Sequence, residues 1–459
     1  MVEYISVDSI APASYNPRKL SDESAENLRA SLQKIGVVIP ILVNRRNNII
    51  IAGHQRTKCA KSVGYTEIPA IYVDDVVHGD EIKFNQFHNG VENKSRHHIG
   101  ANTDGLPQEQ FISTENNRFT INESEFQMVY VKEICKLMMK YGNVFSAVIC
   151  KGVVLFADEY VYACRLLGYD VNCYICSDDK FSDILYYFKQ DYGVYSYDNI
   201  ERHTYVQGLA QMNRSADGEY KNKQNKSALY EKMVLPFLKG ISDKSIGILD
   251  FGCGKGAYIE KVHREFPNAL GMEFYNNNGS AINVGKGNRQ IDAVIQHVKD
   301  YGRFDVVICD SVLNSVDSVD AENSVVACLN LFTKDKLFIS GRNMSFQQGV
   351  MRNKKSRGLY NYIYFCDDNN FTANYRKGQW YFQKFHTRQQ AIDLLERNGF
   401  EVVNIDFAES ASSFRIECRK VKELTPEQYV YAIDFEFNLP LPNGKRYGRN
   451  DEVKKLFGL

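Results

Sequence analysis

The stretch Ile248-Leu249-Asp250-Phe251-Gly252-Cys253-Gly254-Lys255-Gly256 decides the fold of the second half of this chain. An apolar run ends in an acidic residue and then opens into three glycines that alternate with other residues. This pattern is typical of a parallel strand that turns sharply into a helix around a nucleoside ligand, because glycine adopts backbone angles closed to other residues and lets the main chain approach the ligand. The stretch therefore predicts an α/β fold with a nucleoside site at its glycines.

Alternating strand and helix patterns surround this stretch over residues 241–420. The predicted strands are 246–250, 269–274, 304–309 and 336–340, followed by a helix over 388–398 and an antiparallel pair over 401–405 and 414–418. This order is typical of a doubly wound sheet. Glu273 and Asp310 come at the carboxyl ends of two predicted strands, and such folds bind ligands at that edge of the sheet.

The spacing of the glycines narrows the ligand. A nicotinamide-binding fold favours Gly-x-Gly-x-x-Gly, and here the third glycine comes one residue earlier. With Glu273 at the end of the second strand, the region resembles the class I S-adenosylmethionine-dependent methyltransferases, which have a Rossmann-like fold. The resemblance implies that Asp250, Gly252, Gly254 and Gly256 hold the methionine part of S-adenosylmethionine, and that Glu273 accepts hydrogen bonds from the ribose hydroxyls. The alternative is a Rossmann-like domain without a cofactor.

The acceptor of the methyl group is less evident. Methyltransferases that act on exocyclic amines of DNA usually carry a Pro-Pro motif after the fourth strand, and those that act on cytosine carbon use Pro-Cys; neither dipeptide occurs in this chain. The corresponding segment is Asp310-Ser311-Val312-Leu313-Asn314-Ser315-Val316. Asp310 and Asn314 are the candidate catalytic residues, since both follow the carboxyl end of a strand and Asn314 can orient an amine or amide. A helix-capping role is the alternative for Asn314.

Two further segments point to a narrower family. Residues 312–316 and 376–385, together with the glycine stretch, resemble the methyltransferases associated with DNA phosphorothioation islands. The resemblance spans most of residues 245–400. It implies DNA modification without naming a target atom.

An insertion over residues 341–388 is the candidate substrate-binding region. Its basic residues greatly outnumber its two aspartates, and aromatic residues lie between them. Cations for phosphates and flat rings for extruded bases suit an enzyme that acts on nucleic acid. The candidate substrate-binding residues are Arg352, Arg357, Arg376, Lys377 and Trp380. Tyr360, Tyr362 and Tyr364 alternate as in a strand, so covering a sheet is the alternative for them.

Residues 1–92 form a separate small α/β pattern. Helices are predicted from Ser21 to Leu32 and from Gly53 to Gly64, and strands over 4–10, 37–43, 49–52 and 69–73. With the motifs Asn16-Pro17-Arg18 and Gly53-His54-Gln55-Arg56, this pattern resembles the ParB/sulfiredoxin-like domain. The resemblance implies nucleotide phosphate binding at Gly53, His54, Gln55 and Arg56, and free amides at a helix start suit an anion.

Two departures from this family qualify that implication. The usual loop of partition proteins is Gly-Glu-Arg-Arg, and sulfiredoxins carry a cysteine where His54 stands, so sulfiredoxin chemistry is not expected. The alternative is that residues 53–56 are a helix cap in a module that docks on DNA.

A degenerate second copy of this unit is predicted over residues 122–199. Lys34-Ile35-Gly36-Val37-Val38 is echoed by Lys140-Tyr141-Gly142-Asn143-Val144, and the phosphate loop is replaced by Ala157-Asp158-Glu159-Tyr160. Two carboxylates would repel a phosphate, so the second copy is not expected to bind nucleotide; chance similarity of two small α/β units is the alternative. The remaining segments are predicted as a linker over 93–121, a helical linker over 200–240 that includes a helix over 228–238, and a C-terminal extension over 421–459.

Composition bounds the remaining properties. The chain has 459 residues, 44% hydrophobic content, zero formal net charge and 11 cysteines without a paired framework, which favours several soluble domains in a reducing cytosol. No apolar run reaches the length of a membrane span, so no membrane partner is expected. Cys173 and Cys176 lie on one predicted strand and point to opposite faces, so no metal is expected. A homodimer is compatible with the sequence.

The sequence therefore predicts a cytoplasmic S-adenosylmethionine-dependent methyltransferase that acts on DNA through a ParB-like module, of the kind found in phage or mobile-element modification systems. Two alternatives stay open. One is a DNA-binding partition or regulatory protein whose methyltransferase fold senses the cofactor. The other is methylation of RNA or of a small molecule.

Overall fold

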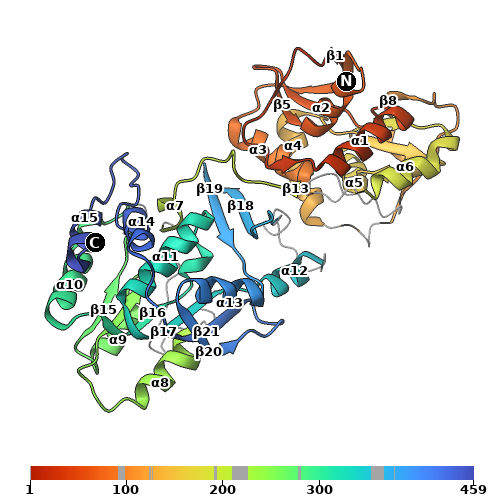
Figure 1. Ribbon diagram of the computed structural model, residues 1–459. Helices are drawn as coiled ribbons and strands as arrows, with labels where there is room; N and C mark the ends of the chain where they lie inside the picture. Colours follow the sequence, from red (N-terminus) through yellow and green to blue (C-terminus); the bar gives the residue numbers. More distant parts are fainter. Residues whose placement is uncertain are drawn as a thin grey trace. The chain divides into compact units, whose positions relative to one another are not determined.

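The computed structural model of the chain describes residues 2–90, 99–122, 126, 128–190, 194–208, 226–277, 281–352, 366–376 and 378–459 (Figure 1). The chain divides into two compact units. The first comprises Met1–Ile200, Asn353–Asp368 and Tyr375–Gly378, and the second comprises Glu201–Arg352, Asn369–Asn374 and Gln379–Leu459.

The first unit begins with a five-stranded sheet in the order β1-β6-β4-β5-β2. Its strands are β1 (Glu3–Ser6), β2 (Ala11–Pro12), β4 (Ile41–Asn44), β5 (Ile49–Ala52) and β6 (Glu67–Val73), and its helices are α1 (Asp22–Ile35), α2 (His54–Ser62) and α3 (His78–Gly90). The predicted start of α1 is confirmed, because the Ser21 side chain accepts a hydrogen bond from the Ser24 amide. The strand predicted from Val37 begins only at Ile41, since Pro40 has no amide proton to donate to a ladder.

A second sheet in the same unit has the order β8-β12-β10-β11-β7-β9. Its strands are β7 (Ile99–Ala101), β8 (Gln110–Thr114), β9 (Phe119–Ile121), β10 (Ala147–Cys150), β11 (Val153–Phe156) and β12 (Val171–Ile175), and its helices are α4 (Met128–Tyr141), α5 (Asp158–Leu167) and α6 (Phe181–Phe188). A pair of two-residue strands, β3 (Arg18–Lys19) and β13 (Val194–Tyr195), forms a separate small ladder in this unit.

The linker predicted over residues 93–121 is wrong for residues 99–121. β8 pairs with β12 along five residues, and β7 and β9 pair with each other beside β11. These strands are short and the turns between them are polar, so the segment shows no clear strand periodicity. Phe119 is nevertheless 3% exposed and belongs to the core.

The two sheets of this unit repeat one design. β4 pairs parallel with β6 and antiparallel with β5, and β10 pairs parallel with β12 and antiparallel with β11. The residues that precede α2 and α5, Gly53 and Ala157, both have left-handed backbones, with φ of 100° and 70°. These parallels support the predicted duplication, which we retain as a proposal.

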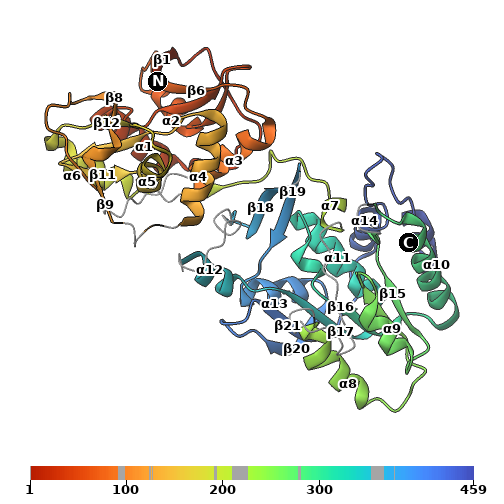
Figure 2. The same ribbon diagram turned by 180° about the vertical axis from the view of Figure 1, so that it is seen from behind.

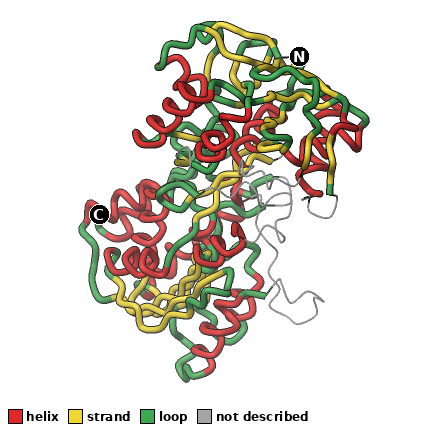
Figure 3. Tube along the Cα trace, turned by 90° about the vertical axis from the view of Figure 1, so that its right-hand side faces the viewer, coloured by secondary structure: helices red, strands yellow, loops and turns green. Residues whose placement is uncertain are grey.

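The second unit is built on a six-stranded sheet in the order β15-β14-β16-β17-β21-β20. The strands are β14 (Ile248–Phe251), β15 (Ala269–Met272), β16 (Phe304–Cys309), β17 (Thr333–Arg342), β20 (Phe400–Asp406) and β21 (Ser413–Lys420). The helices that follow individual strands are α9 (Ala257–His263), α10 (Val284–Tyr301), α11 (Val319–Phe332) and α13 (Arg388–Arg397), and Figures 2 and 3 show the strands between helices.

The strand directions confirm the predicted doubly wound sheet. β15, β14, β16 and β17 run parallel, and β21 and β20 form the predicted antiparallel pair. The chain steps from β14 to β15 on one side and returns to β16 on the other, so the strand order reverses next to β14. Such a reversal is where α/β sheets of this kind bind ligands, at the carboxyl ends of the strands.

Segments outside the sheet complete this unit. α7 (Tyr205–Gly208), a π-helix over Tyr230–Val234 and α8 (Leu235–Lys239) precede the sheet, so the helix predicted over 228–238 is present with a π-helical middle. α12 (Met344–Arg352) and the strands β18 (Phe371–Arg376) and β19 (Gln379–Lys384) belong to the insertion. Tyr360, Tyr362 and Tyr364 lie outside the described residues.

The predicted C-terminal extension is an integral part of the second unit. It contains α14 (Pro426–Glu436) and α15 (Asn450–Phe457), and α14 packs against α11 (Figure 1). Its loop also contacts the residues that follow β15, the edge strand of the sheet: Tyr447 donates a hydrogen bond to the Phe274 carbonyl, and Tyr275 donates one to the Pro440 carbonyl.

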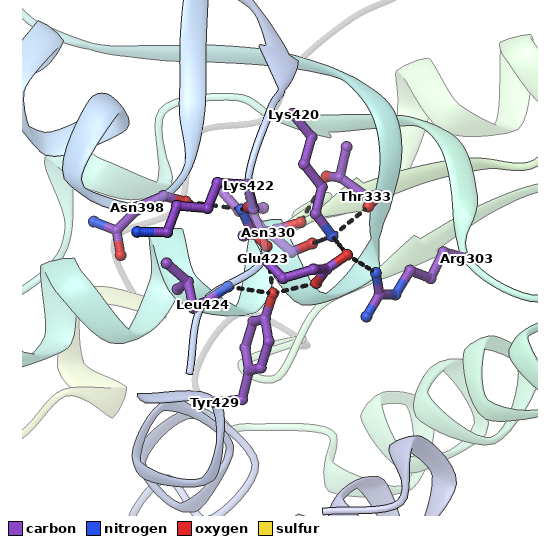
Figure 4. Close-up of polar contacts among 10 residues, drawn as sticks. Arg303, Asn330, Thr333, Asn398, Lys420, Lys422, Glu423, Leu424 and Tyr429 are labelled. Carbon is purple, nitrogen blue, oxygen red and sulfur yellow. Dashed lines mark hydrogen bonds and ion pairs between the residues drawn. The ribbon is translucent and has the colours of Figure 1, made fainter. Parts of the chain in front are cut away.

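A buried polar cluster fastens this extension to the sheet (Figure 4). The hydroxyl of Tyr429 lies 2.5 Å from Asn330 Oδ1 and 2.6 Å from Glu423 Oε2, which share its single proton, and it accepts a hydrogen bond from the Leu424 amide at 3.0 Å. Lys420 donates to the carbonyls of Asn330 and Thr333 at 2.8 and 3.0 Å. The cluster satisfies polar groups that would be costly to bury unpaired.

Among the described residues, no helix is long and apolar enough to cross a membrane.

Candidate functional site

The glycine stretch forms a tight turn between β14 and α9. Gly252, Gly254 and Gly256 have φ values of 81°, 59° and 88°, which only glycine adopts without strain. The amides of Gly252 and Cys253 donate to the Met272 carbonyl at 2.7 and 3.1 Å, which ties the turn to the end of β15.

Gly252 and Gly254 serve different purposes in this turn. A Cβ atom on Gly252 would lie 2.2 Å from Cγ2 of Val312, so this position is closed by packing against the segment after β16. A Cβ atom on Gly254 would meet no atom of the described chain within 4 Å. Gly254 therefore presents bare backbone to open space, as a binding turn requires.

Glu273 connects the turn to the residues after β15. Its Oε2 accepts a hydrogen bond from the Gly254 amide at 3.0 Å, and its Oε1 accepts one from the Tyr275 amide at 2.8 Å. The side chain is 8% exposed. The carboxylate thus lies beside the glycine turn, where the sequence predicts it.

Asp250 is a buried carboxyl with one oxygen free for a ligand. Its Oδ2 accepts a hydrogen bond of 2.6 Å from the Tyr230 hydroxyl, and its Oδ1 is buried with no partner in the described part of the chain. Burial raises the pKa of Asp250, the hydrogen bond from Tyr230 lowers it, and the charges of Asp310 and Glu273 raise it; together they place it at about 7. A carboxyl in this state is poised to receive a cationic or N–H donor.

Tyr230 is a site residue that the sequence did not reveal. It begins the π-helical segment, and such segments are frequent at functional sites. The amphipathic pattern over residues 228–238 predicts a helix, but nothing in it indicates which side chain forms a hydrogen bond with Asp250.

Asp310 is held by two serines at the carboxyl end of β16. Its Oδ1 accepts hydrogen bonds from Ser340 Oγ at 2.7 Å and from Ser311 Oγ at 3.1 Å. Ser311 itself has a left-handed backbone, with φ of 67°, and its amide donates to Ser340 Oγ at 2.9 Å. This strained turn fixes the direction of the Asp310 side chain.

Asn314 ends a short 3₁₀ helix, Val312–Asn314, directly after this turn. Its Oδ1 is buried and has no hydrogen-bond partner in the described residues. The structure therefore brings Asp250, the glycine turn, Glu273, Asp310 and Asn314 to the carboxyl ends of the parallel strands. Two buried acceptor atoms there, Oδ1 of Asp250 and Oδ1 of Asn314, have no hydrogen-bond partner among the described residues.

The structure does not describe the side chains of four of the five predicted substrate-binding residues. Arg357 and Lys377 lie outside the described residues, and the side chains of Arg352 and Arg376 are likewise not described. Trp380 lies on β19 and is partly buried. Within the described residues no group of three or more His, Cys, Asp or Glu side chains could hold a metal ion.

In the first unit, the loop Gly53 to Arg56 is bound to its own main chain. His54 accepts a hydrogen bond of 3.0 Å from the Ala13 amide, and Gln55 donates one of 2.6 Å to the Arg18 carbonyl. Arg56 donates to the carbonyls of Ile39 and Pro40. These contacts hold the loop in place.

Burial changes the acidity of two of these side chains. It lowers the pKa of His54 to about 4, so the imidazole is neutral at physiological pH. Burial, aided by the charge of Arg18, lowers the pKa of Arg56 to about 10, so the guanidinium stays charged. The loop therefore carries one charged side chain, whose guanidinium donates to its own main chain.

Comparison with known proteins identifies both parts of the chain. Residues 1–84 match the family model of the ParB N-terminal domain, and residues 223–405 match that of a methyltransferase domain. The chain thus has a ParB-like N-terminal domain followed by a class I methyltransferase fold, as the sequence predicted.

Several relatives share the N-terminal part. A "Probable chromosome-partitioning protein ParB" of Campylobacter jejuni is 32% identical over 151 residues, which cover 31% of this chain and 52% of that protein. A nucleoid occlusion protein of Geobacillus kaustophilus is 38% identical over 74 residues, 15% of this chain and 26% of that protein. The chain therefore spans about half, or less, of the curated relatives that it matches.

Solved structures resemble the chain only distantly. Magnesium protoporphyrin IX methyltransferase from Synechocystis, crystallised with S-adenosylhomocysteine, is 17% identical, covering 41% of this chain and 80% of that one with a TM-score of 0.27. The Caulobacter crescentus partition protein ParB, crystallised with CTP-gamma-S, is 20% identical, covering 21% of this chain and 56% of that one with a TM-score of 0.20. Scores this low carry no functional argument.

Proposed function

We propose that this protein is an S-adenosylmethionine-dependent methyltransferase that modifies DNA. The observation that carries the catalytic part is the glycine turn with Glu273 beside it, in a region that matches a methyltransferase domain. The turn offers bare backbone at Gly254, and Glu273 offers a carboxylate next to it.

The residues present fit the methyl donor. S-adenosylmethionine carries an ammonium group and two ribose hydroxyls as donors, and it supplies an electrophilic methyl group on a sulfonium when bound. The unmet Oδ1 of Asp250 suits the ammonium, and Glu273 suits the vicinal hydroxyls because a carboxylate accepts several hydrogen bonds at once. Asp310 and Asn314, at the next strand end, would bind and orient the acceptor.

DNA as the acceptor is favoured by two features. Residues 1–84 match a domain of DNA-partition proteins, which would bring the catalytic unit to DNA. The insertion over 341–388 is rich in arginine, lysine and aromatic residues, as suits phosphate contact and base stacking. The similarity of residues 312–316 and 376–385 to methyltransferases associated with DNA phosphorothioation supports a role in DNA modification by a phage or mobile element, in the cytoplasm.

Binding of the donor can be tested by calorimetry. Gly254→Arg should abolish binding of S-adenosylmethionine while the protein stays folded, because the new side chain projects into open space where the ligand would lie. Gly349→Arg, on α12, is the control, since a Cβ atom there also meets nothing within 4 Å. Saturable binding that survives Gly254→Arg, or no binding to the wild type, would refute the proposed cofactor site.

The acceptor can be identified with labelled donor. The protein is incubated with methyl-labelled S-adenosylmethionine and separate DNA, RNA and protein, and the modified nucleoside is identified by mass spectrometry. Label in DNA that is lost with Asp310→Ala supports the proposal. Label only in RNA, protein or a small molecule would replace DNA by that acceptor.

A second candidate function is a DNA-binding regulator whose methyltransferase fold senses the cofactor. The match of residues 1–84 to the ParB N-terminal domain favours it, as does the charged Arg56 at the loop resembling a nucleotide site. Nucleotide-dependent loading on DNA without any methyl transfer would favour this function over the enzyme.

A further inference from the structure

Tyr230 reaches the donor site through a direct hydrogen bond, although it lies outside the sheet. It begins the π-helix Tyr230–Val234 and is 2% exposed. Its hydroxyl donates to Asp250 Oδ2 at 2.6 Å, and Asp250, which is 3% exposed, lies two residues before Gly252. The last torsion of an aspartate side chain is soft, so a bond to one carboxylate oxygen decides where the other oxygen points. Tyr230 therefore fixes the direction of Asp250 Oδ1.

A second tyrosine holds Tyr230 in place. The rings of Tyr230 and Tyr258 are stacked, with centroids 4.6 Å apart and an angle of 22° between their planes. Tyr258 lies in the first turn of α9, directly after the glycine turn. Its hydroxyl donates to Glu231 Oε1 at 2.8 Å and accepts from the Ser227 amide at 3.1 Å, while the Tyr230 amide donates to Ser227 Oγ at 3.1 Å. The π-helix is thus joined to both ends of the glycine turn, to Asp250 before it and to Tyr258 after it.

The second oxygen of Asp250 is left for a ligand. Oδ1 is buried and has no hydrogen-bond partner in the described part of the chain, and a buried acceptor without a donor is costly. A cationic N–H group compensates such an oxygen best, because hydrogen bonds between charged groups are the strong ones. In the proposed methyl donor, that group is the ammonium of the amino-acid part.

We infer that Tyr230 is a positioning residue for the methyl donor: its hydroxyl holds Asp250 so that Oδ1 receives the ammonium of the amino-acid part. This inference rests on the proposed function. Tyr230 acts through Asp250, so its hydroxyl should matter for ligands that carry the ammonium and be indifferent for ligands that lack it.

Two ligands that differ in the ammonium test this role. S-adenosylhomocysteine carries it, whereas 5′-methylthioadenosine has the same adenosine and thioether without the amino-acid part. Tyr230→Phe keeps the stacked ring and removes the hydroxyl, so in calorimetry it should weaken S-adenosylhomocysteine by about 10-fold or more and leave the Kd for 5′-methylthioadenosine within about 2-fold. Equal losses for both ligands, or no loss for either, overturn the inference. If the wild type binds neither ligand, the proposed function fails instead.

Tyr258→Phe is the matched control for this substitution. It removes the other hydroxyl of the stacked pair, which contacts Glu231 and Ser227 rather than Asp250. It should leave the ratio of the two affinities unchanged. A ratio that changes as much as in Tyr230→Phe would mean that the pair supports the site as a whole, and would refute the specific role of Tyr230.

A double-mutant cycle shows whether Tyr230 acts through Asp250. Asp250→Ala alone should weaken S-adenosylhomocysteine, and adding Tyr230→Phe to it should change the Kd by less than about 2-fold, because the group that Tyr230 positions is already gone. Losses that multiply in the double variant would show that Tyr230 acts by another route, and the inference would be wrong.

Discussion

At the scale of single residues, Gly252 and Gly254 differ in role although they stand two positions apart: packing requires a glycine at 252, and the proposed ligand requires one at 254. We expect Gly252→Ala to destabilise the protein by about 1–3 kcal/mol, because its Cβ atom would lie 2.2 Å from Val312 Cγ2. Gly254→Ala meets no such contact, so it should cost only the strain of its left-handed backbone, about 1 kcal/mol. Denaturant unfolding of both variants checks this, and equal losses would show that the turn is not packed as described.

The repeated loop of the first unit allows a matched pair of substitutions. Ala157 has φ of 70°, a left-handed backbone that favours glycine, so Ala157→Gly should be neutral or stabilising by up to about 1 kcal/mol. Gly53→Ala at the corresponding position should destabilise, since its Cβ atom would lie 2.5 Å from Ile41 Cγ2. Thermal unfolding measures both. A destabilised Ala157→Gly variant would contradict the shared loop geometry.

Sequence predicts the residues whose role follows from local spacing. The positions of Gly252, Gly254, Gly256 and Glu273 follow from the chain around them, because a strand that turns into a helix requires left-handed residues at fixed offsets. Tyr230 and Ser340 could not be predicted. Each comes from a distant segment, and its place beside the site depends on tertiary packing.

At the scale of elements, the Tyr429 hydroxyl connects α14 with α11 and with the segment after β21. Tyr429→Phe leaves Asn330, Glu423 and the Leu424 amide with fewer partners in a buried cluster. We expect a loss of about 1–3 kcal/mol in the free energy of unfolding.

Tyr431→Phe provides the control for this change. Tyr431 lies on the same helix and is 54% exposed, so the loss of its hydroxyl should alter stability by less than about 0.5 kcal/mol. Equal effects of the two substitutions in urea unfolding would mean that the cluster contributes little.

Elements with strong periodicity are predictable, and short ones are not. The sequence predicts β16 at its observed bounds because it is a nearly continuous apolar run. It predicts the pair β20 and β21 with its direction because apolar and polar residues alternate along both strands. β7, β8 and β9 were taken for a linker, since strands of three to five residues gain their stability from pairing with neighbours rather than from their own pattern.

At the scale of the whole molecule, stability should depend on pH through Glu436. This carboxyl ends α14 and is 5% exposed, and burial, and then the charge of Asp317, raise its pKa to about 8. The folded state holds its proton up to about pH 8, whereas the unfolded chain releases it near 4.5, so the folded state binds more protons between these values. Stability conferred by this group is therefore complete below pH 4.5 and is lost as the pH rises towards 8.

Glu436→Gln should remove that part of the pH dependence. Urea unfolding at several pH values between 4.5 and 8 should give a flatter stability profile for the variant than for the wild type. Asp250, whose pKa is raised to about 7, contributes a slope in both proteins, so the difference between the profiles belongs to Glu436. Parallel profiles would contradict the raised pKa.

The packing of the C-terminal segment against α11 and Phe274 has a consequence for recombinant work. A chain cut after β21 would keep every strand of the sheet and the whole glycine turn, yet would lose α14, Phe437 and Tyr447 and expose Phe274 and the face of α11 that α14 covers. Exposed apolar surface of this kind promotes association between molecules. Truncation at residue 420 would therefore yield aggregates rather than a minimal soluble catalytic fragment, and a working excision must run through α15.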